Sequence, residues 1–154
     1  MTGKADFSAA EWETISEAPA TAGLLVMTAQ RGGVFRETLA IAKAYTEARQ
    51  KHGQSTLLDE LVASKPKTDH TRYHSPEELR QAGLGHLRDS IRVLEPKATP
   101  TEVSEVKQFI VTVAERVAHA HREAGVDVSP AEQAAIQEIT DALGQTSSPP
   151  TEGR

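Results

Sequence analysis

Apolar residues recur every three or four positions along most of this chain, which is the spacing of helices that bury one face. The clearest stripe lies between residues 100 and 124 and consists of Val103, Val106, Ile110, Val113 and Val117. Residues 19–31 are apolar on nearly every side, which is typical of a helix surrounded by its neighbours. We expect these two helices to pack together at the centre of the fold, with Leu25 and Val113 buried.

Hydroxyl residues followed by proline mark the starts of three predicted helices. Such pairs occur at Ser75-Pro76, Thr99-Pro100 and Ser129-Pro130, and proline at the first position after a hydroxyl cap is typical of helix N-termini. Together with the apolar stripes, these pairs predict an all-α fold of about seven helices. The expected helices cover about residues 9–17, 19–31, 35–52, 55–64, 76–94, 100–124 and 130–143.

Two stretches of the chain can be aligned at a constant offset of 95 residues. Residues 29–37 and 124–132 each contain the end of an apolar helix, a glycine-containing break and a glutamate near the start of the next helix. Because one helix pair alone would leave its apolar face in water, we expect two pseudo-repeated helical halves packed as one bundle. The expected organisation is a single domain over 1–144, halves over about 8–64 and 75–144, a linker over 65–74 and a disordered tail over 145–154.

Composition and charge narrow the classes of function. The chain has no cysteine and a net charge of −5, so it lacks thiolate metal ligands and the basic character that favours nucleic-acid binding. The strongly apolar run at residues 24–27 is too short to cross a bilayer, and the first residues lack a signal-peptide pattern. We therefore expect a cytoplasmic protein that binds neither membrane nor nucleic acid.

Catalytic and cofactor motifs are missing from the sequence. It has no Gly-x-Ser-x-Gly motif and no glycine-rich phosphate loop with its lysine. His119 and His121 are two positions apart, which directs them to different sides of a helix. His70 and His74 have the spacing of helical neighbours but lie in the polar linker. Zinc needs three or four converging ligands, so we expect neither histidine pair to bind it. Because the catalytic motifs are missing as well, we expect a protein that is not an enzyme and holds no cofactor.

A family resemblance is carried by residues near the C-terminus. An apolar helix and a short break precede Val128-Ser129-Pro130-Ala131-Glu132, Ala135, Ile136, Ile139 and Leu143. This pattern resembles the second half of TerB-like domains of the tellurite-resistance type, in which two such units pack as an all-helical bundle. The resemblance covers about residues 19–52 and 103–143, and it implies a bacterial stress-response setting.

The resemblance also implies candidate metal ligands. In TerB-like domains, an acidic residue at the break and a glutamate of the following helix are associated with metal binding. Glu37 and Glu132 match the helix glutamate, and Asp127 is the acidic residue at the second break. Helix capping explains the same two glutamates, because a carboxylate in the first turn stabilises a helix.

Phe7 and Trp12 flank a capping box formed by Ser8 and Glu11, at the positions of a hydrophobic staple. The staple predicts that Trp12 anchors the first helix to the core of the domain itself. The alternative is a loosely held helix on which Phe7 and Trp12 form an interaction patch for a partner protein.

Two functions remain open at this point. We expect a non-enzymatic helical domain that acts through contacts with an unidentified protein partner. The alternative is a domain that binds a small ligand or a divalent metal ion in the groove between the two halves.

Overall fold

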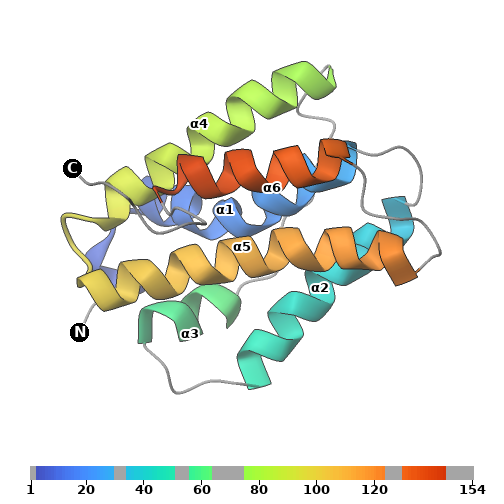
Figure 1. Cartoon of the computed structure of the whole chain (residues 1–154). Helices are drawn as coiled ribbons and strands as arrows, with labels where there is room; N and C mark the ends of the chain where they lie inside the picture. Colours follow the sequence, from blue (N-terminus) through green and yellow to red (C-terminus); the bar gives the residue numbers. More distant parts are fainter. Residues whose placement is uncertain (1–2, 30–33, 51–55, 64–74, 124–129, 145–154) are drawn as a thin grey trace, which may run out of the picture.

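The computed structural model describes residues 3–29, 34–50, 56–63, 75–123 and 130–144. They form a bundle of six α-helices with one short 3₁₀ turn, and this part of the chain contains no strand (Figure 1). The all-α prediction is confirmed. The elements are η1 (Lys4–Asp6), α1 (Ala9–Ala29), α2 (Val34–Gln50), α3 (Thr56–Ala63), α4 (Pro76–Leu94), α5 (Pro100–Glu123) and α6 (Pro130–Ala142).

The sequence prediction is wrong at Pro19. The helices expected over 9–17 and 19–31 are one helix, α1, so six α-helices rather than seven occur among the described residues. Pro19 has no N–H, so it cannot donate to the carbonyl of Ile15, and proline at this position normally breaks a helix. The helix continues because all residues from 17 to 27 are buried against neighbouring helices, and this packing outweighs the local cost.

Helix α1 is the centre of the bundle. It packs chiefly against α5 and α4, and in Figure 1 it lies behind α5 and α6. Leu25 and Val113 are both buried, as predicted. Helix α4 approaches α1 closely at Gly83, where an added Cβ would lie 2.9 Å from Cδ2 of Leu25. Glycine at this position therefore sets the distance between the two helices.

Helix starts agree with the capping signals wherever the structure describes both partners. The Ser8 amide donates to Glu11 Oε1 (2.9 Å), and the Glu11 amide donates to Ser8 Oγ (3.1 Å). Thr99 and Glu102 form the same reciprocal pair, and Ser75 Oγ accepts a backbone amide in the first turn of α4. These bonds satisfy amides that have no partner inside their own helix.

Helices of the two predicted halves pack against one another in one bundle. Helix α1 of the first half packs more extensively on α4 and α5 of the second half than on α2. The pseudo-repeat stays a prediction, because the breaks at 30–33 and 124–129 lie outside the described residues, as do the linker and the tail. In the part that is described, no helix combines the length and the apolar character needed to cross a membrane.

Candidate functional site

Phe7 and Trp12 are core residues in the structure. Only 8% of Phe7 and 7% of Trp12 is exposed, and their ring centroids are 6.0 Å apart. The ammonium group of Lys97 lies 5.3 Å from the Phe7 ring centroid and donates to Glu11 Oε1 (2.9 Å), so it covers the start of α1. Phe7 and Trp12 thus lie together in the core, as a hydrophobic staple requires. They do not form an exposed interaction patch in this structure.

The candidate metal ligands are only partly described. Glu132 is fully buried in the first turn of α6, whereas the Glu37 side chain and all of Asp127 lie outside the described residues. Among the residues that are described, no three histidine or carboxylate side chains converge as a metal site would require. A site that joins the three acids therefore stays a prediction.

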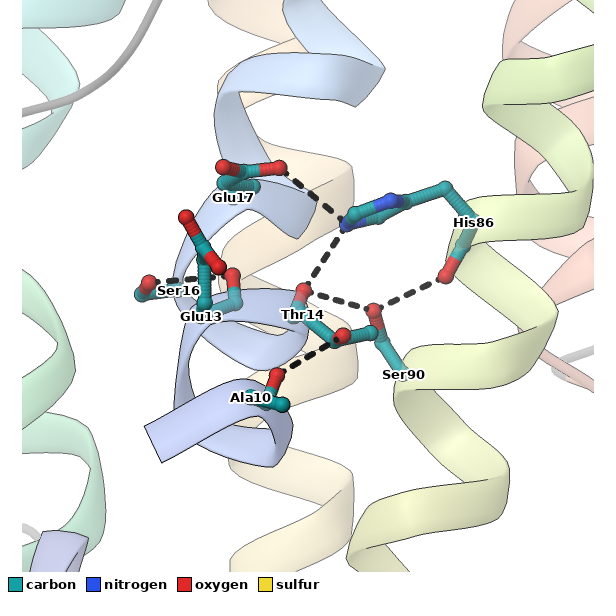
Figure 2. Close-up of polar contacts among 7 residues, drawn as sticks. All are labelled: Ala10, Glu13, Thr14, Ser16, Glu17, His86 and Ser90. Atoms are coloured by element: carbon teal, nitrogen blue, oxygen red, sulfur yellow. Dashed lines mark hydrogen bonds and ion pairs between the residues drawn. The ribbon is translucent and has the colours of Figure 1, made fainter. Parts of the chain in front are cut away.

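A polar cluster lies between α1 and α4, where Figure 2 shows His86 and Ser90 of α4 facing Thr14 and Glu17 of α1. His86 Nε2 is 2.9 Å from the Thr14 carbonyl oxygen and 4.0 Å from Glu17 Oε1. The hydroxyl of Ser90 donates to the carbonyls of Thr14 (3.1 Å) and His86 (2.9 Å). We call these four residues the α1–α4 seam.

The seam has the residue types of a catalytic triad without its geometry. A nucleophilic serine must hydrogen-bond to an imidazole nitrogen, whereas Ser90 donates to backbone carbonyls. A carbonyl only accepts, so the His86 Nε2 that faces it carries the proton. The seam therefore attaches α4 to the backbone of α1, just before the turn in which Pro19 lacks an N–H.

A second polar site lies in the groove between α2 and α5. This hollow, of about 230 Å³, is lined by Ala44, Glu47, Ala48, Leu58, Glu105, Gln108, Phe109, Thr112 and Arg116. Its wall is formed by residues of α2, α3 and α5. Arg116 forms an ion pair with Glu47 across the mouth, and each side chain is about two-fifths exposed.

Two buried polar atoms of the α2–α5 interface have no hydrogen-bond partner in the described structure, Glu105 Oε1 and the Tyr45 hydroxyl. Tyr45 of α2 packs edge-on against Phe109 of α5, with ring centroids 5.1 Å apart. Burial raises the pKa of Tyr45 well above its ordinary value, although nearby Arg49 acts in the opposite direction. Buried groups without partners cost free energy, so they require an explanation.

A second hollow, of about 510 Å³, lies between α5 and α6. It is lined by Thr112, Glu115, Arg116, Ala118, His119, Gln133 and Ile136. Thr112 and Arg116 therefore line this hollow and the α2–α5 groove as well. The exposed face of α5 thus carries two adjacent hollows with Arg116 between them.

Sequence reasoning missed the residues that define the groove. Glu105 and Arg116 lie beside the apolar stripe of α5, where charged residues normally face solvent. The available signal was Phe109, an aromatic residue one turn after Glu105, since such a neighbour can exclude water from a carboxylate. His86 and Ser90 could have been paired by their spacing of four residues.

Comparison with protein-family models, curated proteins and solved structures finds no match for this chain. The resemblance to TerB-like domains accordingly rests on the sequence motif alone.

Proposed function

We propose that this chain is a non-enzymatic domain that acts through protein–protein contacts and binds a basic side chain of its partner in the α2–α5 groove. The observation that carries the proposal is that Glu105 lines the groove and that its buried Oε1 atom has no hydrogen-bond partner in the described structure. An ammonium or guanidinium group would supply the missing donor. The TerB-like stress-response setting enters this proposal only through the sequence resemblance.

Size and charge support a basic side chain as the occupant. The hollow is large enough for one long side chain, and Phe109 and Leu58 provide apolar contact for its methylene groups. Glu47 and Glu105 supply two carboxylates against one cation, Arg116. The net charge of −5 also attracts a basic partner over longer distances.

The second candidate is a small molecule with an ammonium group, because such a ligand would use the same atoms. A divalent ion fits this groove less well, because its lining offers only two carboxylates, Glu47 and Glu105, and Glu47 is already paired with Arg116. A metal ion at Glu132 remains a separate prediction of the sequence resemblance.

Titration with pentylammonium, followed through backbone amide NMR signals, tests the groove directly. We expect shifts confined to the middle of α2 and to residues 105–116 of α5, with a dissociation constant of about 1–10 mM. Pentanol has the same length without the charge and should bind at least about tenfold more weakly. Equal binding of pentanol, or no local shifts, would contradict the proposal.

Glu105→Gln keeps the shape of the side chain and removes its charge, so it should weaken pentylammonium binding about tenfold. Glu77→Gln, an exposed carboxylate of α4 outside the groove, is the matched control and should leave binding unchanged. A peptide with one lysine between alanines distinguishes the two candidates. Binding at least as tight as that of pentylammonium supports a protein partner, whereas binding of pentylammonium alone supports a small ligand.

A further inference from the structure

Arg116 is positioned to act in two hollows. It lines both the α2–α5 groove and the α5–α6 hollow, and its Nη2 atom is engaged by Glu47. A guanidinium group has several N–H donors in a planar fork, and a carboxylate matches that fork well. The ion pair with Glu47 is partly exposed, so it is weak enough for a competing ligand to replace.

We infer that the α5–α6 hollow is a second subsite, which takes a carboxylate group once Glu47 no longer holds Arg116. This inference rests on the proposed function, because a cation in the α2–α5 groove would draw Glu47 away from Arg116. A single partner surface with a basic and an acidic side chain would then engage both hollows. The partner is therefore a protein segment of mixed charge rather than a purely basic one.

The lining of the α5–α6 hollow explains why Arg116 must be released first. Glu115 lies in the same wall and repels an incoming carboxylate while Glu47 neutralises Arg116. Once released, Arg116 offsets Glu115, and the Gln133 amide adds a neutral hydrogen-bond donor. Ile136 and Ala118 provide an apolar surface for the chain that carries the carboxylate.

Pentanoate is the probe for this subsite, again followed by NMR, with signals of α6 near Gln133 as the readout. Glu47→Gln releases Arg116 without any ligand, so it should tighten pentanoate binding about two- to fivefold. Arg116→Gln should abolish the binding. In the Arg116→Gln background, Glu47→Gln should leave pentanoate affinity unchanged. This result would exclude the explanation that Glu47→Gln tightens binding merely by removing a negative charge from the protein.

Coupling between the hollows is the second measurement. Pentylammonium at saturation should tighten pentanoate binding in the wild type by about the same two- to fivefold, and this effect should vanish in Glu47→Gln. If pentylammonium does not bind, the proposed function fails, and the Glu47→Gln comparison still decides the carboxylate subsite. Unchanged pentanoate affinity in Glu47→Gln would overturn the inference.

Discussion

At the α1–α4 seam, polar side chains meet backbone acceptors of the neighbouring helix, whereas at the α2–α5 interface two buried polar atoms meet no partner in the described structure. Both interfaces belong to the same bundle and both bury polar groups among apolar ones. In the seam, Ser90 is completely buried and its hydroxyl reaches two carbonyls. In the groove, Glu105 has the apolar Phe109 and Leu58 beside it.

We interpret this difference as one between a structural role of the seam and the proposed binding role of the groove. A satisfied polar contact fixes how two helices align and contributes modestly to stability. An unsatisfied one lowers stability, so its presence is better explained by a ligand than by folding. The two regions also differ in how closely their helices pack. Gly83 lets α4 lie close to α1, whereas a hollow remains between α2 and α5.

The largest expected effect is that of Leu25→Ala, at the point where α1 meets Gly83 of α4. It should lower the free energy of unfolding by about 2–5 kcal/mol, because a closely packed site cannot collapse into the cavity. Urea unfolding followed by fluorescence of Trp12, the only tryptophan, measures this.

Leu58→Ala, in the wall of the groove, is the matched comparison. It should cost at least about 1 kcal/mol less than Leu25→Ala, because the hollow already beside Leu58 admits water or small movements of its neighbours. Equal costs at the two sites would mean that the groove is packed as tightly as the contact between Leu25 and Gly83.

Smaller changes in the free energy of unfolding should distinguish Ser90 of the seam from Glu105 of the groove. Ser90→Ala should cost about 0.5–1.5 kcal/mol, because a fully buried hydrogen-bond donor is lost. Glu105→Gln should change the free energy of unfolding by less than about 0.5 kcal/mol, because its Oε1 gives up no bond. The same urea series measures both, and a clear loss in Glu105→Gln would show that the groove carboxylate is structural.

The fold was largely predictable from sequence because its signals are local. The caps at Ser8, Ser75 and Thr99 and the stripe of α5 depend on neighbouring residues, and the structure agrees with them. Pro19 was misjudged because the burial that keeps α1 continuous comes from helices distant in sequence.

The candidate sites could not be predicted for a similar reason. Whether a carboxylate such as Glu105 meets a partner depends on how α2 lies against α5, which no spacing along one helix reveals. Arg116 and Glu47 are 69 residues apart, and an exposed ion pair leaves no sequence pattern. Conversely, the motif that the sequence did offer, at Glu37, Asp127 and Glu132, falls mostly outside the described residues.

The smallest expected effect concerns Tyr45, the other buried group without a partner. Tyr45→Phe removes only the hydroxyl, so the free energy of unfolding near neutral pH should stay the same or rise by up to about 1 kcal/mol. A loss of more than about 1 kcal/mol would reveal a hydrogen bond to the hydroxyl and would weaken the contrast between groove and seam.

Alkaline pH sharpens the same test. Burial raises the pKa of Tyr45 in the folded state, so the unfolded chain loses this proton first. The contribution of Tyr45 to stability is therefore complete below its ordinary pKa of about 10 and declines as the pH rises above that value. Urea unfolding of wild type and Tyr45→Phe at increasing pH should show the wild type losing stability faster above pH about 10. Parallel curves would mean that the phenol ionises as readily in the folded protein as in the unfolded chain, and that water reaches the α2–α5 interface around it.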